Sequence, residues 1–222
     1  MAVALIVAAG RGERLGSGRP KALVTVAGRP MLAWSVSSLQ AVTAVERIVV
    51  ALPAEELDSA PPGVQAVAGG QARSQSVREA LLAAGEGDPV IVHDAARPLA
   101  GPDLFERALA DLESSGADAV IAAARVSDTI KEVGEDGRTV LRTLERGRLW
   151  SVQTPQVFRR AALDRVFESA SDELLASATD DAWLIERAGG TVRVVESQPE
   201  NIKITTPADL HVAELLLAER AR

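Results

Sequence analysis

Short, uninterrupted apolar runs rich in Val and Ile alternate along the chain with segments of helical periodicity, and this alternation limits the fold more than any other feature. Runs that are apolar at successive positions predict strands buried on both faces. A repeat of strand and helix predicts an α/β fold with a mostly parallel sheet covered by helices. We expect strands at residues 3–9, 46–53, 64–70, 88–95, 117–124 and 191–197.

Helical patterns separate these strands, and several of them stop at Gly, which commonly ends a helix. They cover residues 30–42, 73–85, 102–116 and 180–190. A last helix begins at "TPADL". There we expect Thr206 to cap the helix, Pro207 to occupy its first turn and Asp209 to face its positive end.

The segment from Val126 to Val152, called here the β-arm, departs from this rhythm. Its polar, alternating strands flank the turn-rich centre "GEDGR" and predict an antiparallel excursion from the main sheet. Such a hairpin has little core of its own, so we expect it to pack on a second copy of the chain. The 222 residues show no internal repeat, and they fit a single domain, 1–222, that contains the arm at 126–152.

Composition excludes several classes of protein. The net charge of −7 and an aromatic content of 3% with no Tyr argue against a protein that grips DNA or RNA. The absence of Cys excludes disulfides and thiolate chemistry, and two His residues disfavour a Ser-His-Asp site. No apolar run approaches the roughly 20 residues that cross a bilayer, and the apolar run 2–9 is too short for a signal peptide. We therefore expect a cytoplasmic protein that binds neither nucleic acid nor membrane.

The first apolar run breaks into "AAGRGERLGSGRPKA", which places flexible backbone and positive charge at the end of a strand. In parallel α/β sheets, ligands bind beyond the carboxyl ends of the strands. Glycines expose backbone N–H donors to phosphate oxygens, while Arg and Lys add charged donors. The residues with these properties are Gly10, Gly12, Gly16, Gly18, Arg11, Arg14, Arg19 and Lys21.

Other interpretations of this loop fit less well. A dinucleotide-binding loop needs G-x-G-x-x-G followed by a helix, and the spacing of Gly10, Gly12 and Gly16 misses by one residue. A Walker loop needs Gly-Lys before Ser or Thr, which Pro20-Lys21-Ala22 does not provide. A plain solvated loop remains the alternative. The loop therefore favours phosphate binding.

A second group, "VIVHDAARP", falls at the same predicted edge of the sheet. Asp94 follows an apolar strand, where a carboxylate suits a magnesium ion or a ribose hydroxyl; a helix cap or turn former is the alternative. We expect Arg97 to pair with Asp94 and hold the turn, and His93 to be a satisfied strand-end residue rather than a catalyst.

The third group is "GGQARSQSVREAL". Gly69 and Gly70 allow close approach, and the Ser76 hydroxyl sits in the first turn of the following helix, which suits recognition of a flat base edge. An ordinary Gly-rich turn, with Ser74 as the N-cap of that helix, fits the residues equally well.

Taken in order, these groups and four later ones resemble the 2-C-methyl-D-erythritol 4-phosphate cytidylyltransferases of the non-mevalonate isoprenoid pathway. The motifs, from Ala8 to Thr205, are "AAGRGERLGSGRPKAL", "GGQARSQSV", "VHDAARP", "SDTIK", "LWSVQTPQVF", "ATDDAW" and "ENIKIT". The resemblance implies a doubly wound, Rossmann-like nucleotidyltransferase sheet with a protruding antiparallel arm. It also implies a reaction in which the acceptor's phosphate attacks the α-phosphorus of CTP, releasing pyrophosphate and leaving a CDP-alcohol.

The resemblance assigns roles residue by residue. Arg14 and Lys21 match the pair that contacts the triphosphate and stabilises the transition state, and Lys203 matches a later lysine that reaches the α-phosphate. Without the motif, Lys203 would be taken for an exposed strand lysine. Magnesium or another divalent cation is expected near the phosphates, which mostly hold it, with Asp94 as its protein ligand. The implied CTP contacts are Ala8, Ala9, Gly10, Gly12, Gly70, Ser76, Asp94 and Ala95.

On the acceptor side, Thr179 in "ATDDAW" fits the substrate pocket. Asp180 and Asp181 invite comparison with a metal pair, although charge at a helix N-terminus explains them at least as well. The resemblance implies that the β-arm crosses to the other protomer of a homodimer, where Thr129 and Arg146 contact a small phosphorylated polyol. Lys131 is a further arm residue that would assist.

Some alternatives stay open. Gln71 stands where some members of the family carry an acidic residue near the base, so the resemblance gives its side chain no role. The nearest alternative is a ribitol 5-phosphate cytidylyltransferase, although "HDAARP" favours the methylerythritol enzyme. A sugar-1-phosphate nucleotidyltransferase that uses UTP or GTP fits the base loop less well. A catalytically inactive nucleotide-binding dimer is weakened by the joint presence of Arg14, Lys21, Asp94 and Lys203.

Overall fold

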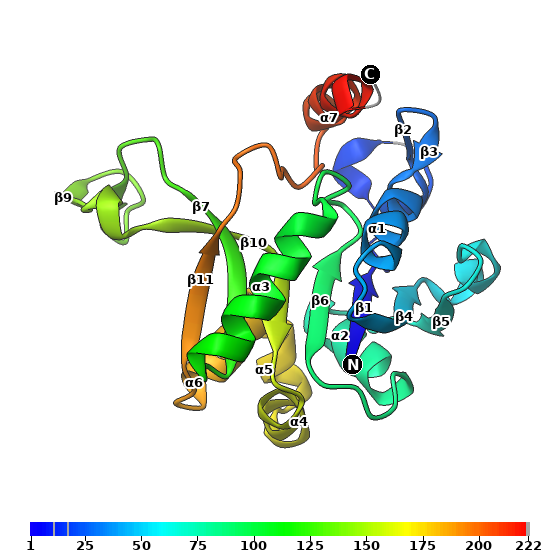
Figure 1. Cartoon of the computed structure of the whole chain (residues 1–222). Helices are drawn as coiled ribbons and strands as arrows, with labels where there is room; N and C mark the ends of the chain where they lie inside the picture. The colour runs from blue at the N-terminus through cyan, green and yellow to red at the C-terminus, as the bar shows by residue number, and fades with distance from the viewer. Residues whose placement is uncertain (11, 17, 221–222) are drawn as a thin grey trace.

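The computed structural model describes residues 1–10, 12–16 and 18–220. At its centre lies a seven-stranded sheet in the order β11-β7-β10-β6-β1-β4-β5 (Figure 1). All neighbouring strands are parallel except where β10 pairs with β6 and β7, so the sheet is mostly parallel, as predicted. The strands are β1 (Ala2–Val7), β4 (Val45–Leu52), β5 (Gln65–Ala68), β6 (Val90–Asp94), β7 (Ala119–Arg125), β10 (Trp150–Phe158) and β11 (Val192–Glu196).

Strand β10 was not predicted, although it lies inside the sheet. A Pro within a strand-like run normally argues against a central strand, because it cannot donate to the ladder. Here the pairing with β7 runs from Trp150 to Val152, skips residues 153–155 and resumes at Gln156. Pro155 therefore sits at an irregularity, and residues 150–152, which the pattern groups with the β-arm, already belong to the sheet.

Helices cover both faces of the sheet, which confirms the doubly wound architecture (Figure 1). Ala4 and Ile6 of β1 contribute to the core under α1 (Met31–Gln40) and α3 (Pro102–Ser115). Val3 and Leu5 contribute to the opposite core. That core lies under α2 (Arg73–Ala83), α4 (Arg160–Ser169), α5 (Asp172–Ser177) and α6 (Asp181–Arg187). Because alternate side chains enter different cores, the strand is apolar at every position.

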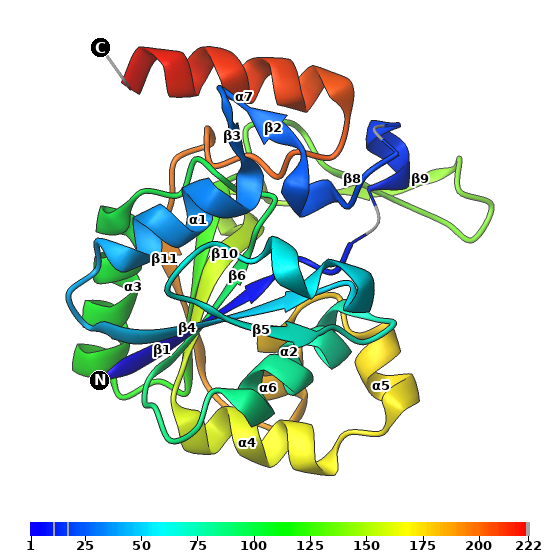
Figure 2. The same ribbon diagram turned by 90° about the vertical axis from the view of Figure 1, so that its right-hand side faces the viewer.

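The last helix, α7 (Pro207–Arg220), begins as the sequence predicts. Asp209 Oδ2 accepts hydrogen bonds from the backbone N–H groups of Thr205 and Thr206, both at 2.8 Å. The Thr206 hydroxyl accepts in turn from the backbone N–H of Asp209 at 3.3 Å. The helix packs over the small hairpin of β2 (Thr25–Val26) and β3 (Arg29–Pro30) (Figure 2).

The β-arm projects from the sheet as a hairpin of β8 (Lys131–Val133) and β9 (Val140–Thr143) (Figure 1). Its centre is a turn in which the backbone N–H of Gly137 donates to the carbonyl of Gly134. All four residues of β9 are exposed. The large apolar side chains that the hairpin exposes are Val133, Val140 and Leu141. None of the helices in the described part of the chain is long and apolar enough to cross a membrane.

Candidate active site

Loops that follow β1, β5 and β6 meet at the carboxyl edge of the sheet and enclose a cavity of about 430 Å³, called here the first cavity. This is the edge at which open α/β sheets bind ligands. The structure brings eleven of the predicted site residues together around it. They are Ala8, Ala9, Gly10, Gly12, Arg14, Lys21, Gly70, Ser76, Asp94, Ala95 and Lys203.

The glycine loop folds back on Lys21. Gly12 has a φ of +68°, and a Cβ at this position would lie 2.8 Å from the Cβ of Lys21. The backbone N–H of Lys21 donates to the carbonyl of Gly10 at 3.1 Å. Gly12 therefore permits a turn that presents Lys21, at the start of the 3₁₀ turn Lys21–Leu23, to the first cavity. Arg11, which was expected to add charge here, lies outside the described residues.

The proposed base loop is shaped by Ser76. Its hydroxyl accepts a hydrogen bond from the backbone N–H of Gly70 at 3.1 Å. A Cβ on Gly69 would lie 2.5 Å from the Cβ of Ala9, so only Gly lets this loop approach the first loop so closely. The alternative in which Ser74 caps α2 is wrong, because α2 begins at Arg73 and Ser74 is buried inside it. Instead the side chain of Gln75 accepts from the backbone N–H of Ala72 at 2.9 Å.

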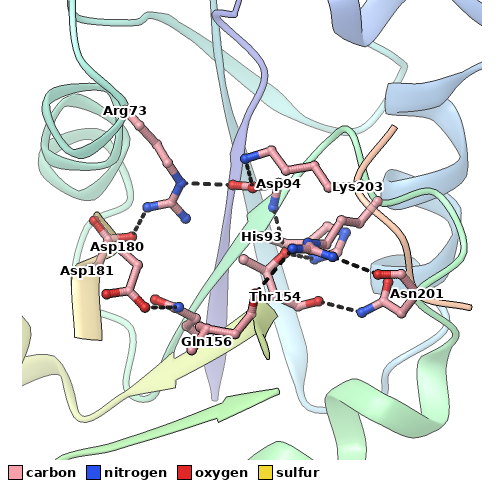
Figure 3. A network of polar contacts seen from close by, with 11 residues as sticks. Arg73, His93, Asp94, Thr154, Gln156, Asp180, Asp181, Asn201 and Lys203 are labelled. Atoms are coloured by element: carbon pink, nitrogen blue, oxygen red, sulfur yellow. Dashed lines mark hydrogen bonds and ion pairs between the residues drawn. The ribbon is translucent and has the colours of Figure 1, made fainter. Parts of the chain in front are cut away.

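A second cavity, of about 410 Å³, lies beside the first. Three residues line both cavities: Arg73, Asp94 and Lys203. Arg73 Nε donates to Asp94 Oδ1 at 2.9 Å, and Lys203 Nζ contacts Asp94 Oδ2 at 2.6 Å (Figure 3). The Asp94 carboxylate is thus held from two sides, and these three side chains form what we call the junction of the two cavities.

Arg73 also reaches a second carboxylate. Its Nη1 pairs with Asp181 Oδ2, and the Asp181 side chain is fully buried. Asp180 caps α6 instead, because its Oδ1 accepts from the backbone N–H of Trp183 at 2.9 Å. Asp180 Oδ2 accepts from Gln156 Nε2 at 2.8 Å. Helix capping therefore explains Asp180, whereas Asp181 serves as a partner for Arg73.

Arg97 does not pair with Asp94 as expected. Its Nη1 donates to the carbonyl of Asn201 at 2.7 Å and its Nη2 to that of Val152 at 3.4 Å. Arg97 lines the second cavity and ties it to the segment that carries Lys203. The Asn201 side chain donates to the carbonyl of Thr154 at 3.0 Å, which anchors the same segment to β10.

His93 is a buried structural residue. Its Nδ1 lies 3.0 Å from the Thr154 hydroxyl, which accepts from the backbone N–H of Asp94 at 3.0 Å. Whether the hydroxyl donates to Nδ1 or accepts from it depends on the tautomer of the ring. Burial lowers the pKa of His93 to about 4, so the ring is neutral near pH 7. His93 lines neither cavity, and the expectation of a satisfied strand-end residue holds for Nδ1 only, because Nε2 has no hydrogen-bond partner among the described residues.

Ion pairing at the junction keeps the Asp94 side chain ionised. Burial by itself would raise the pKa of Asp94, but the adjacent charges of Arg73 and Lys203 outweigh it and hold that pKa well below its usual range. Burial lowers the pKa of Lys21 to about 8, with a further contribution from the positive charge of Lys203. The charged form of Lys21 at the first cavity is therefore disfavoured by burial, and a bound anion would stabilise it.

The residues at the junction suit a divalent cation that takes most of its coordinating oxygens from a bound phosphate compound rather than from the protein. In the described part of the chain, no group of three or more His, Cys, Asp or Glu side chains could hold a metal ion. Magnesium commonly takes one or two protein carboxylates and completes its shell with substrate phosphates and water. Asp94, which lines the first cavity on the edge where phosphates are predicted, provides one such carboxylate.

The remaining predicted residues divide between two places. Thr179 lines the second cavity. Thr129 and Arg146 line neither cavity and are exposed in the β-arm, where the Arg146 guanidinium donates to the carbonyl of Ser127. Sequence reasoning missed Arg73, although it lies inside "GGQARSQSV". The only signal was a charged residue at the first position of a helix whose other early residues are polar, and this signal is weak.

The sequence and the fold were compared with known proteins. The model of a family described as IspD: 2-C-methyl-D-erythritol 4-phosphate cytidylyltransferase matches residues 2–219. A protein of that name from Rubrobacter xylanophilus is 44% identical over 229 residues, which cover 100% of this chain and 96% of the relative. One from Rhodococcus jostii is 45% identical over 223 residues, covering 99% and 96%.

Solved structures agree with the sequence comparison. The crystal structure of 2-C-methyl-D-erythritol 4-phosphate cytidylyltransferase from Thermus thermophilus has a TM-score of 0.80 and 32% identity, covering 98% of this chain and 100% of that chain. The 4-diphosphocytidyl-2C-methyl-D-erythritol synthase from Anaerococcus prevotii has a TM-score of 0.83 and 29% identity, covering 98% of both chains.

Proposed function

The chain belongs to the 2-C-methyl-D-erythritol 4-phosphate cytidylyltransferase family, and from this we infer that it transfers CMP from CTP to 2-C-methyl-D-erythritol 4-phosphate. The products are 4-diphosphocytidyl-2-C-methyl-D-erythritol and pyrophosphate. The observation that carries the proposal on the structural side is the pair of adjacent cavities that share Arg73, Asp94 and Lys203. A transfer between two substrates needs two sites that meet at the reacting atoms.

The first cavity is proposed to hold CTP. Of its lining residues, Ser76 and Gly70 are proposed to contact the base, and Asp94 and Ala95 are proposed to contact the ribose. Arg14 and Lys21 carry positive charge on the loop after β1, where the triphosphate would extend. Ala8, Ala9, Gly10 and Gly12 line the same cavity. The backbone N–H of Ala8 donates to the carbonyl of Ala51 at 2.9 Å, so the N–H groups proposed to bind phosphate oxygens are those of Ala9, Gly10 and Gly12.

The second cavity is proposed to hold the acceptor. Arg97, Thr179 and Lys203 give it polar and charged groups for a phosphate and hydroxyls. Ile121, Val152 and Trp183 give it an apolar side, which suits a branched carbon skeleton with a methyl group. This combination favours methylerythritol phosphate over ribitol phosphate, which carries no methyl group.

The reaction proposed at the junction is a direct displacement. An oxygen of the acceptor's phosphate forms a bond to the α-phosphorus of CTP while the bond from that phosphorus to the pyrophosphate oxygen breaks. The phosphate is already an anion at neutral pH, so no general base is required. The protein's contribution is to bring the two anions together and to stabilise the developing negative charge with Arg14, Lys21 and Lys203.

Magnesium, or another divalent cation, is the proposed cofactor. When bound, it would neutralise and orient the phosphates, with Asp94 as its protein ligand. Because the phosphates would supply most of its ligands, metal affinity is expected to depend on CTP. Equilibrium dialysis of the divalent ion with and without CTP tests this expectation, and equal retention in both would contradict it.

The β-arm is proposed to complete the acceptor site of a second protomer, so that the active form is a homodimer. Its exposed apolar residues, Val133, Val140 and Leu141, support an interface, and Thr129 and Arg146 line neither cavity of their own chain. A mixing experiment tests this arrangement. At a methylerythritol phosphate concentration well below KM, Arg146→Ala and Lys203→Ala should each have little activity alone, whereas subunit exchange between them should restore about a quarter of wild-type activity. No recovery on verified exchange would refute a shared site.

Pyrophosphate release tests the whole proposal. The protein is offered CTP, UTP, GTP or ATP with magnesium, against methylerythritol 4-phosphate or ribitol 5-phosphate. Release with CTP and methylerythritol phosphate alone is expected. Release with CTP and ribitol phosphate would keep the chemistry and change the acceptor. CTP binding with no release for either acceptor would indicate a nucleotide-binding dimer without catalytic activity.

A further inference from the structure

Arg73 connects elements that line the two cavities and come from different parts of the fold. It is the first residue of α2, directly after the loop that carries Gly70. Its Nε binds Asp94 at the end of β6, and its Nη1 binds Asp181 in the first turn of α6 (Figure 3). One planar guanidinium thus joins the base loop, the junction and the helix that follows Thr179.

The two cations that hold Asp94 differ in their freedom to move. Lys203 contributes a flexible side chain that is 41% exposed, and Asp94 is the one carboxylate with which it forms an ion pair among the described residues. Arg73 is 21% exposed and pairs with two carboxylates, of which Asp181 is fully buried. Lysine is a mobile point charge, whereas arginine presents a rigid fork.

These differences matter when phosphates enter the junction. Lys203, which is partly exposed, loses one ion pair if it turns from Asp94 to a phosphate oxygen. If Arg73 moved away, Asp181 would remain as a buried, unpaired charge, which is strongly unfavourable. Arg73 is therefore the cation that stays when Lys203 moves.

We propose that Arg73 is a positioning residue for the transfer of CMP. Its ion pair with Asp181 fixes the guanidinium, which keeps Asp94 oriented toward the nucleotide while the Lys203 side chain moves from Asp94 to the phosphates. The proposal deepens the cytidylyltransferase function and rests on it. It assigns no bond-making step to Arg73. Its effect is on alignment, where a displacement of about 1 Å can cost on the order of 100-fold in rate.

A purely structural role for Arg73 is the competing explanation. In that case the guanidinium only compensates the buried charge of Asp181, and any loss of activity follows from loss of the fold. The two explanations differ in a variant that removes both charges together. Arg73→Met with Asp181→Asn leaves no buried unpaired charge, yet Asp94 loses its fixed partner.

The experiment compares Arg73→Met, the double variant Arg73→Met/Asp181→Asn, and Arg73→Lys with the wild-type protein. Arg78→Met is the matched control, because Arg78 lies on the same helix and pairs with Asp172 of α5 at 2.8 Å, away from both cavities. Thermal unfolding, calorimetric titration with CTP and magnesium, and initial rates of pyrophosphate release are measured for each.

The single Arg73→Met variant should unfold at a lower temperature, and the double variant should regain most of that loss. The double variant should bind CTP within about threefold of wild type while its kcat falls about 100-fold. Arg73→Lys should recover part of kcat, and Arg78→Met should match wild type in CTP binding and rate. A double variant with wild-type kcat would overturn the proposal in favour of charge compensation. An equal loss of CTP affinity and kcat would overturn it in favour of direct nucleotide binding. Failure of the proposed function would appear separately, as absence of turnover in the wild-type protein.

Discussion

The Lys21 ammonium gives a quantitative prediction for nucleotide binding. Its pKa is lowered to about 8, chiefly by burial, with Lys203 and Arg14 lowering it further against the raising effect of Asp94 and Asp209. Below this pKa the free protein already carries the charge that the triphosphate needs. Above it, Lys21 must take up a proton when CTP binds, because a polyphosphate beside the amine favours the charged form.

The size of the effect follows from the pKa. If the bound nucleotide raises it to its usual range, CTP affinity falls about twofold between pH 7 and pH 8 and about tenfold between pH 7 and pH 9. About half a proton is taken up per CTP bound at about pH 8. Titration calorimetry at saturating magnesium, in two buffers of different ionisation enthalpy, measures both quantities.

Lys21→Arg is the control, since arginine keeps its charge across this range. Its CTP affinity should depend much less on pH, and its binding should take up no proton at about pH 8 beyond what other groups contribute. A wild-type affinity that is constant from about pH 7 to about pH 9, or a wild-type profile identical to that of Lys21→Arg, would refute the reasoning.

The remaining predictions concern the junction, the acceptor and the fold. Lys203→Met should lower kcat about 100-fold with a much smaller change in the CTP dissociation constant, as measured by initial rates and calorimetry; equal changes would argue against a transition-state role. Arg146→Ala should raise KM for methylerythritol phosphate more than KM for CTP in steady-state kinetics, and an equal rise would count against an arm on the acceptor side. Trp183→Ala should reduce kcat/KM for methylerythritol phosphate more than for erythritol 4-phosphate, which lacks the methyl group; a common loss would remove Trp183 from acceptor selection. Asp209→Ala removes the carboxylate that accepts from the backbone N–H groups of Thr205 and Thr206 at the start of α7, and it should lower the free energy of unfolding by about 1 kcal/mol in urea denaturation; an unchanged stability would contradict this role.

Local patterns predicted the parts of the fold that local chemistry decides. The run at β1 is apolar at every position because Ala4 and Val3 enter opposite cores, and this signature is visible in the sequence. The cap at Asp209 depends on neighbours within four residues. Strand β10 was missed because its irregularity at residues 153–155, which accommodates Pro155, depends on a partner strand far away in the sequence.

The same distinction holds for the site. The topological rule predicted that Lys21 and Asp94 lie at one edge of the sheet, and the family resemblance added Lys203; all three line the first cavity. They did not predict the partner of Asp94. Arg97 is closer in sequence, but it binds the carbonyl of Asn201, whereas Arg73 reaches Asp94 across 21 positions of the chain. Which of several arginines meets a carboxylate is set by tertiary packing.

The central claim is that the acceptor's phosphate attacks the α-phosphorus of CTP directly at the junction of the two cavities. The stereochemical course of the reaction tests it most directly. CTP carrying a sulfur atom in one configuration at the α-phosphorus is turned over with methylerythritol 4-phosphate, and the configuration of the product is determined. A single in-line displacement predicts inversion at phosphorus. Retention would require two displacements through a covalent intermediate on the protein, and it would contradict the account.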